Sequence, residues 1–259
     1  MKSIRSILLI ALLQAVSVTS AFAADELAQI KSAGVFKVGT EGTYAPFTYH
    51  DESGKLTGFD VDIASAIAQR LGVKPEFVEG KWDGLIAGLD VNRYDAVINE
   101  VSVTDARKAK YDFSTPYITT RAVLIVRSDN TTVKTFDDLK GKKSANTLTS
   151  NFGKIAKDHG ADVVPVQGFN ESIDLLTSGR VDATVNDSLS FLDFKKHKPD
   201  AQVKVVVTDS SSDADQSAVL LRKGDPALVA AIDKALADIK ADGTYAKISA
   251  KYFGKDVSQ

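Results

Sequence analysis

The chain of 259 residues contains no cysteine, one tryptophan and three histidines. Without cysteine it forms no disulfide bond, has no cysteine-ligated metal site and performs no thiol catalysis. The histidines, His50, His159 and His197, lack the close pairing of zinc-binding motifs. A Gly-x-Ser-x-Gly elbow, a phosphate-binding loop and a dinucleotide fingerprint are also missing from the sequence. We therefore expect neither a metal nor another cofactor.

An excess of charge and long apolar runs are also lacking. The chain has 32 Lys and Arg against 34 Asp and Glu, a formal net charge of −2. So balanced a composition argues against a nucleic acid or an anionic membrane surface as partner. After the N-terminal segment, no stretch is apolar and long enough to span a bilayer. With 44% hydrophobic residues the chain has enough apolar side chains for real cores, and we expect a monomer.

The N-terminus has the three parts of a secretory signal peptide. Met1–Arg5 is short and basic, Ile7–Val18 is mainly apolar, and Ala21-Phe22-Ala23 is a small-x-small cleavage site. Residues 1–23 are therefore predicted to be removed, so that the exported protein begins near Ala24. Bacterial lipoproteins carry their lipid on a cysteine, which this chain lacks. The sequence thus predicts a protein that diffuses freely in the periplasm.

One phrase occurs twice in the chain. Arg93–Glu100 (RYDAVINE) returns as Arg180–Asp187 (RVDATVND), 180 − 93 = 87 residues later. In each copy a short apolar run follows a helix-like stretch and ends on an amide beside a carboxylate. This pattern predicts the same helix-loop-strand unit built twice. Because ligands of open α/β sheets lie beyond the carboxyl ends of strands, two such ends are expected to face each other across a cleft.

Strand and helix patterns alternate along the mature chain, which predicts an α/β fold with mainly parallel sheets. The order suggests a discontinuous first lobe, residues 24–118 plus 216–259, and a second lobe, residues 119–215. Two crossing segments, near 118–121 and 212–216, would then form a hinge. Two continuous domains in sequence are the alternative that the pattern leaves open.

The stretch Asn99–Arg107 follows the first copy of the phrase and is rich in polar groups. Strand alternation would place Asn99 on one side and Glu100 and Ser102 on the other. The guanidinium of Arg107, beside hydroxyl and amide donors, suits a carboxylate through two parallel hydrogen bonds. The alternative is a surface arginine in a lysine-rich loop.

The second copy ends on Asp187, whose carboxylate is suited to a ligand ammonium group. The alternative is an N-cap for the helix that follows. Together, Arg107 and Asp187 would recognise a zwitterion, one from each lobe. The aromatic residues Tyr44, Trp82 and Phe152 are candidates for the pocket wall, with ordinary core packing as their alternative.

Several phrases, in order along nearly the whole mature chain, resemble the bacterial polar amino-acid-binding proteins of ABC importers, solute-binding protein family 3. They are Glu41–Phe47 (EGTYAPF), Gly58–Ala64 (GFDVDIA), Arg93–Val97 (RYDAV), Tyr111–Tyr117 (YDFSTPY) and Asp242–Tyr245 (DGTY). The resemblance implies a type II periplasmic binding protein, a clamshell of two lobes whose central cleft holds one amino acid.

The resemblance also implies roles for single residues. An aromatic that stacks on the ligand corresponds to Tyr44, and a pocket residue to Trp82. The ligand carboxylate would be bound by Ser102 and Arg107, and the ammonium group by Asp187. A loop of the second lobe corresponds to Thr149, Ser150, Asn151 and Phe152, with Thr149 standing where glycine is usual.

Three phrases, Lys81–Gly84, Asn99–Ser102 and Asn186–Ser188, look most like cystine-binding members. Glu41 and Glu100 at the pocket rim would instead suit a basic side chain. The expected function is therefore a non-enzymatic, periplasmic amino-acid receptor, with cystine favoured, that delivers its ligand to an inner-membrane ABC permease. The alternatives are a prephenate or arogenate dehydratase of the same fold, which would use Glu41 or Glu100 as acid or base, and a free ligand-sensing partner of a kinase.

Overall fold

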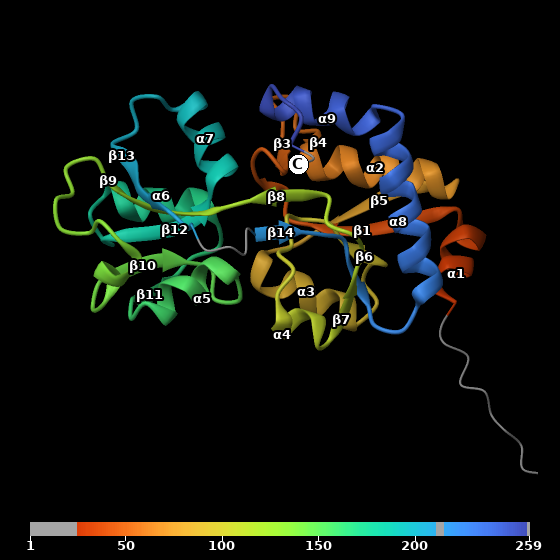
Figure 1. The fold of residues 1–259 in the computed structure, drawn as a ribbon, viewed down its shortest axis with the longest axis horizontal. Helices are drawn as coiled ribbons and strands as arrows, with labels where there is room; N and C mark the ends of the chain where they lie inside the picture. The colour runs from red at the N-terminus through yellow and green to blue at the C-terminus, as the bar shows by residue number, and fades with distance from the viewer. Residues whose placement is uncertain (1–24, 211–214, 258–259) are drawn as a thin grey trace, which may run out of the picture.

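A computed structural model of the chain describes residues 25–210 and 215–257. The predicted signal peptide, residues 1–23, lies outside these ranges and stays a prediction. The described chain forms two α/β lobes side by side, each built on one five-stranded sheet (Figure 1). Within the described ranges, no helix has the length and apolar character needed to cross a membrane.

The sheet of lobe 1 has the strand order β5-β1-β6-β15-β7. Its strands are β1 (Val35–Thr40), β5 (Lys74–Glu79), β6 (Ala96–Val97), β7 (Tyr111–Phe113) and β15 (Leu220–Arg222). β1 pairs in parallel with β5 and β6, whereas β15 is antiparallel to both β6 and β7. Four of the five strands therefore run in one direction, as the alternating pattern predicts.

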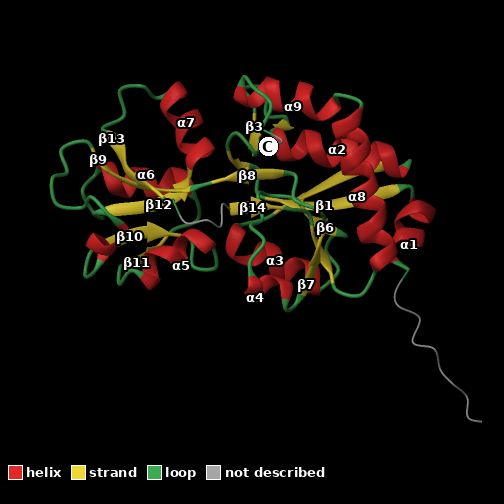
Figure 2. Ribbon diagram, in the orientation of Figure 1, coloured by secondary structure: helices red, strands yellow, loops and turns green. Residues whose placement is uncertain are grey.

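Helices cover both faces of this sheet (Figure 2). They are α1 (Glu26–Ala33), α2 (Phe59–Leu71), α3 (Trp82–Asp90), α4 (Asp105–Lys108), α8 (Pro226–Ala241) and α9 (Thr244–Phe253). α2 packs on α8 and α9, with the fully buried ring of Phe59 5.0 Å from that of Phe253. Gly58, at the start of α2, has φ 135°, and a Cβ there would lie 2.1 Å from the carbonyl oxygen of Phe47. Only glycine fits that junction without strain.

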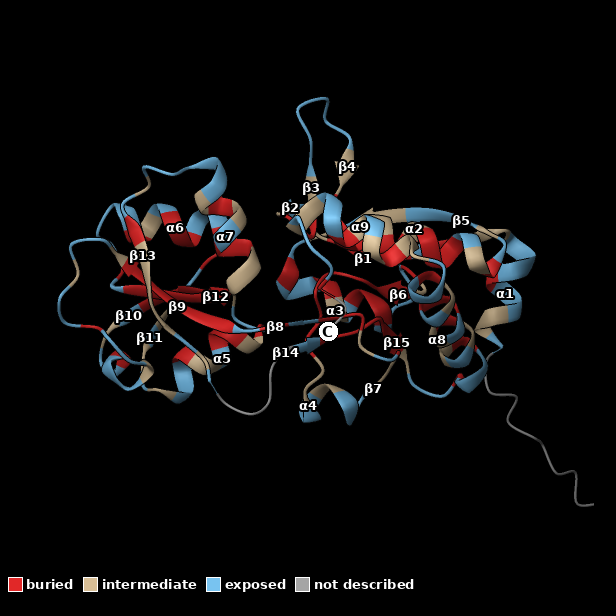
Figure 3. Ribbon diagram, turned by 45° about the horizontal axis from the view of Figure 1, so that its top comes forward, coloured by how far each residue is buried: buried red, intermediate tan, exposed pale blue. Residues whose placement is uncertain are grey.

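A small three-stranded sheet stands out from lobe 1 on the side nearer lobe 2 (Figure 3) and consists of β2 (Thr43–Tyr44), β3 (Thr48–His50) and β4 (Leu56–Thr57). Tyr44–Phe47, a non-periodic stretch with a proline, predicts a rigid loop, and this prediction is wrong for Tyr44 alone, since the next three residues form a turn. Tyr44 pairs with Thr48 and so belongs to a two-residue strand. Two residues are too few for alternation to show in a sequence.

Lobe 2 repeats the arrangement with the order β11-β10-β12-β9-β13. Its strands are β9 (Ala122–Arg127), β10 (Lys143–Asn146), β11 (Asp162–Pro165), β12 (Ala183–Asp187) and β13 (Val203–Thr208). Its helices are the 3₁₀ helix η1 (Phe136–Leu139) and α5 (Asn151–Asp158), α6 (Phe169–Thr177) and α7 (Ser188–His197). Five consecutive residues of β9, Ala122–Val126, are buried, as expected of a strand covered on both faces (Figure 3).

The two copies of the repeated phrase occupy matching places. They form β6 and β12, each the third strand of its sheet. Each is parallel to one neighbour, β1 or β10, and antiparallel to the other, β15 or β9. The prediction that the phrase builds the same unit twice is confirmed by this topology.

Two short strands, β8 (Ile118–Thr120) and β14 (Asp215–Ser217), lie between the lobes and pair in antiparallel fashion (Figure 1). The chain enters lobe 2 after β8 and is back in lobe 1 after β14. The predicted second crossing segment, 212–216, falls partly outside the described residues. The lobe boundaries at 118/119 and 215/216 therefore stay a prediction.

Candidate functional site

A cavity lies between the two lobes and takes its walls from both. Of the eleven predicted site residues, eight line it: Glu41, Tyr44, Trp82, Asn99, Glu100, Ser150, Asn151 and Phe152. Sequence reasoning missed the other lining residues, Thr43, Asn146, Thr147, Gly168, Phe169, Ser172 and Asn186. The space between these walls is about 500 Å³, part of which is open to solvent.

One wall of the cavity in lobe 1 is built by a reciprocal pair. The side-chain amide of Asn99 donates to Oε2 of Glu41 at 2.7 Å, and the backbone N–H of Glu41 donates to Oδ1 of Asn99 at 2.7 Å. Burial raises the pKa of Glu41 to about 7, the Asn99 bond works against the rise, and the charge of Asp83 adds to it. Glu41 thus changes charge near neutral pH beside the cavity.

Asn99 and Glu100 line the same cavity, so the predicted alternation is wrong at this point. Glu100 has φ 51°, in the left-handed region, which breaks the alternation of a strand. β6 has already ended at Val97. The backbone N–H of Glu100 donates to Oδ2 of buried Asp60 at 2.5 Å, which helps to hold this conformation. Glu100 is only 3% exposed, so it is a buried wall residue and not a rim residue.

Aromatic side chains from both lobes enclose the cavity. Tyr44, Trp82, Phe152 and Phe169 are each less than 10% exposed. The hydroxyl of Tyr44 donates across the interface to Oδ1 of Asn186 at 2.8 Å. Burial, together with neighbouring carboxylates, raises the pKa of Tyr44 well above its usual range. The indole Nε1 of Trp82 is buried and has no hydrogen-bond partner among the described residues, which leaves one donor for a ligand.

The N-terminus of α5 forms the facing wall in lobe 2. Ser150 caps this helix by accepting from the N–H of Gly153 at 3.0 Å, and its hydroxyl donates to the carbonyl of Thr147 at 3.1 Å. The side-chain nitrogen of Asn151 is buried without a hydrogen-bond partner in the described parts of the chain. A helix N-terminus with an extra amide donor favours a negatively charged group.

Ser102 and Arg107 lie behind this cavity and do not line it. The guanidinium of Arg107 sits 5.4 Å from the centre of the Trp82 ring and donates to the carbonyl of Ser102 at 2.9 Å. It also reaches the carbonyl of Thr149 in lobe 2, at 3.5 Å. The hydroxyl oxygen of Ser102 is buried and, within the described residues, unpartnered. Their role in carboxylate binding stays a prediction.

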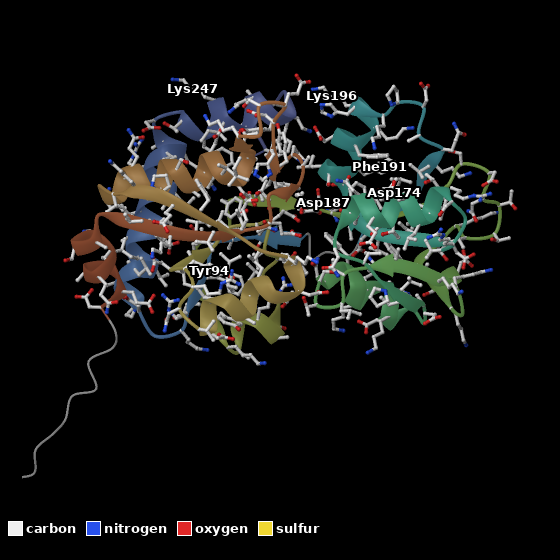
Figure 4. The ribbon with its side chains drawn as sticks, turned by 180° about the vertical axis from the view of Figure 1, so that it is seen from behind. Tyr94, Asp174, Asp187, Phe191, Lys196 and Lys247 are labelled. Atoms are coloured by element: carbon white, nitrogen blue, oxygen red, sulfur yellow. The ribbon has the colours of Figure 1, made fainter. Side chains whose placement is uncertain are left out.

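Asp187 is fully buried where the two lobes meet (Figure 4). Its Oδ1 accepts from the N–H groups of Leu189 at 2.7 Å and Ser190 at 3.0 Å, so it caps α7. The capping alternative is therefore observed directly. Asp187 does not line the cavity, but the adjacent Asn186 does, and the charge of Asp187 contributes to the raised pKa of Tyr44 and of Asp60.

Further hydrogen bonds join the lobes next to the cavity. Asp83, in the first turn of α3, accepts from the N–H of Thr149 at 3.0 Å, from its hydroxyl at 2.9 Å and from the N–H of Leu148 at 3.4 Å. The hydroxyl of Ser190 donates to the carbonyl of Ala45 at 2.8 Å. The hydroxyl of Thr149 thus provides one of the contacts between the lobes.

The contacts of Asp83 predict that Asp83→Ala weakens ligand binding, although Asp83 does not line the cavity. Loss of bonds that form only when the lobes meet costs the closed form about 1 kcal/mol at an exposed site, or about fivefold in Kd. Calorimetry measures this effect. Asp90→Ala is the matched control, because that carboxylate lies on the same helix and accepts from the Tyr111 hydroxyl, a bond within lobe 1. Equal Kd values for the two variants would contradict the prediction.

Within residues 25–210 and 215–257, no group of three or more His, Asp or Glu side chains is placed to hold a metal ion. The polar groups of the cavity are carboxylates, amides and hydroxyls, which suit an organic molecule with hydrogen-bonding ends.

A family model described as bacterial extracellular solute-binding proteins, family 3, matches residues 36–255. The L-cystine-binding protein TcyA of Bacillus subtilis is 45% identical over 236 residues, which are 91% of this chain and 87% of the relative.

Two solved structures are also similar. An ancestral arginine-binding protein bound to arginine is 43% identical, with a TM-score of 0.80 and coverage of 85% of this chain and 99% of its own. The unliganded, open L-cystine solute receptor of Neisseria gonorrhoeae is 44% identical, with a TM-score of 0.60 and coverage of 90% and 99%.

Proposed function

The chain belongs to family 3 of the bacterial extracellular solute-binding proteins, and from this we propose that it is the periplasmic receptor of an amino-acid ABC importer with cystine as its ligand. Similarity to a cystine-binding protein over most of both chains supports this ligand. The protein binds a solute and is not an enzyme. It works with an ABC permease in the membrane. We propose that the protein is a monomer and that it delivers cystine to this permease.

One observation carries the proposal: the cavity between the two lobes is lined both by hydrogen-bond donors without partners among the described residues and by carboxylates. Unpartnered donors, Trp82 Nε1 and Asn151 Nδ2, and the N-terminus of α5 suit a ligand carboxylate. The carboxylates of Glu100 and Asp187 suit an ammonium group. A zwitterion satisfies both kinds of group at once, and a molecule with only one charge leaves buried groups without partners.

Closure of the lobes around the ligand follows from the same geometry. Hydrogen bonds from Tyr44, Asp83 and Ser190 join the lobes around the cavity, so these bonds must break before a ligand can enter. We propose that the ligand enters an open form and stabilises the closed form, as periplasmic binding proteins do in general. The better match to an arginine-bound structure than to an open, unliganded one supports a closed arrangement here.

A basic amino acid is the second candidate ligand, because Glu41 and Glu100 both line the cavity. The arginine-bound ancestral structure is similar in fold and identity. A cationic side chain would need Glu41 in its ionised form. Because its pKa is raised to about 7, the affinity for arginine would rise as the pH increases through 7.

A thermal-shift screen followed by calorimetry tests the ligand. We expect cystine at a hundredfold excess over its Kd to stabilise the mature protein by about 2.7 kcal/mol, which raises Tm by roughly 5 to 10 °C. The control ligands are arginine, cysteine and glutamine, each at the same concentration as cystine. Tighter binding of arginine, with an affinity that increases from pH 6 to pH 8, would replace cystine by a basic ligand.

A further inference from the structure

Glu100 is the residue that connects the cavity with both strands that cross between the lobes. Its side chain lines the cavity. Its Oε1 accepts from the hydroxyl of Thr120 at 3.2 Å and from the hydroxyl of Ser217 at 3.4 Å. Thr120 ends β8 and Ser217 ends β14, and all three side chains are at most 5% exposed. One carboxylate therefore contacts the candidate ligand site and both crossing strands.

The backbone around Glu100 is tied to the same strands. Ser102 forms a bridge with Ser217, the N–H of Val103 donates to the carbonyl of Gln216 at 2.8 Å, and the N–H of Ala218 donates to the carbonyl of Val101 at 3.1 Å. The segment that carries the ligand wall thus lies along β14 like an added strand. A displacement of β14 relative to lobe 1 would disturb this segment directly.

Two buried side chains of lobe 1 also fix the backbone of Glu100. Its N–H donates to Asp60 and lies 3.3 Å from the hydroxyl of Tyr117, the residue just before β8. A left-handed conformation at a residue other than glycine costs on the order of 1 kcal/mol and persists only where the surroundings fix it. The fold keeps this costly conformation where it brings one carboxylate against both crossing strands.

On the basis of the proposed function, we infer that Glu100 is a positioning residue that couples ligand contact to closure of the lobes. Its hydrogen bonds from Thr120 and Ser217 keep the ligand wall and the two crossing strands in one fixed relation. A ligand that binds against Glu100 then favours the closed arrangement. Without these two bonds, the ligand still contacts lobe 1, but binding no longer determines how the lobes are placed.

The absence of cysteine makes the test direct, because two introduced cysteines are the only labelling sites. Lys196 on α7 and Lys247 on α9 are exposed and lie on different lobes (Figure 4). Spin labels on Lys196→Cys and Lys247→Cys report the distance between the lobes by pulsed EPR. The experiment uses the mature protein with cystine as the probe, or with arginine if the screen selects it, and calorimetry measures Kd on the same samples.

The variant Thr120→Val with Ser217→Ala removes both hydroxyls and leaves the cavity lining unchanged. We expect its Kd to rise about tenfold and its distance distribution to keep an open population at saturating ligand. A variant that keeps both hydroxyls, Thr120→Ser with Ser217 unchanged, should close completely. Thr119→Val is the matched control, because Thr119 lies on β8 but is exposed, and it should behave as the wild type does.

Glu100→Gln separates ligand contact from coupling, since its amide oxygen still accepts from both hydroxyls. We expect weaker binding but complete closure once the site is saturated. Complete closure of the Thr120→Val, Ser217→Ala variant with a Kd within twofold of the wild type would overturn the inference. Wild-type protein that binds none of the amino acids would overturn the proposed function instead, so the two failures are distinguishable.

Discussion

Asp187→Asn is expected to reduce the affinity for the amino acid by at least 30-fold, with the fold and stability unchanged. Removing the charge from one partner of a buried, hydrogen-bonded ion pair costs about 2 to 5 kcal/mol, or about 30- to 5,000-fold in Kd. Asp187 is fully buried at the lobe boundary, so no solvent screens such a pair. Calorimetry on the mature protein measures the loss.

The substitution is informative because asparagine caps a helix as well as aspartate does. Asp187 holds the N–H groups of Leu189 and Ser190, and an asparagine oxygen retains both bonds. The two interpretations of this residue therefore predict different results. If Asp187 only caps α7, the substitution leaves Kd unchanged. If Asp187 also binds the ammonium group of the amino acid, the substitution weakens binding.

Asp225→Asn provides the matched control. Asp225 caps α8 by accepting from the N–H of Leu228 at 2.9 Å and is also buried, but its chain neighbours do not line the cavity, whereas Asn186, next to Asp187, does. We expect the same Kd as in the wild type. If Asp187→Asn binds the amino acid as tightly as Asp225→Asn does, Asp187 is a cap and nothing more.

Much of the architecture was predictable because local signals agree with the fold. α2 has an apolar face and ends at Gly72, which takes the left-handed conformation at its C-terminus. α8 begins with the Asp225 cap and Pro226 at its first position. The repeated phrase predicted two matching strands, since its apolar runs are buried in the middle of both sheets. Each of these signals is carried by residues close together in the sequence.

The site was predictable only in part, because its geometry depends on long-range contacts. Asn146, Phe169, Ser172 and Asn186 line the cavity, yet by pattern they are ordinary strand and helix residues. The amide of the repeated phrase was a usable signal: its two copies are Asn99 and Asn186, and both reach the cavity. The conformation of Glu100 was not predictable, since it is fixed by Asp60, 40 residues earlier.

Asp60 leads to a second large effect, on stability rather than binding. It lies in the first turn of α2 and is 1% exposed, and its Oδ1 has no hydrogen-bond partner among the described residues. Burial raises its pKa from 3.8 to about 7, against the opposing effects of the Glu100 N–H and the Tyr117 hydroxyl. The folded protein therefore binds this proton more tightly than the unfolded chain does.

The difference between the folded and the unfolded pKa of Asp60 sets the sign of the pH dependence. The carboxyl of an unfolded chain ionises near pH 4, whereas the folded protein keeps its proton up to about pH 7. The contribution of Asp60 to stability is thus greatest below about pH 4, falls as the pH rises from about 4 to 7, and is smallest above 7. A shift of about three pKa units corresponds to a loss of about 4 kcal/mol in total. Glu41, whose pKa is also raised to about 7, changes stability in the same direction.

Asp60→Asn is therefore expected to stabilise the unliganded protein at pH 8 by a few kcal/mol, which raises Tm by roughly 10 °C, and to change it little at pH 4. Asparagine keeps an oxygen for the N–H of Glu100 and has no charge to bury. Asp62→Asn, on the same turn of α2 but bonded to Lys251 and Tyr252, is the control and should keep the wild-type slope between pH 5 and pH 8. A wild-type Tm that rises over this interval, or an Asp60→Asn variant less stable than the wild type at pH 8, would show that Asp60 is ionised in the fold and that its charge stabilises Glu100.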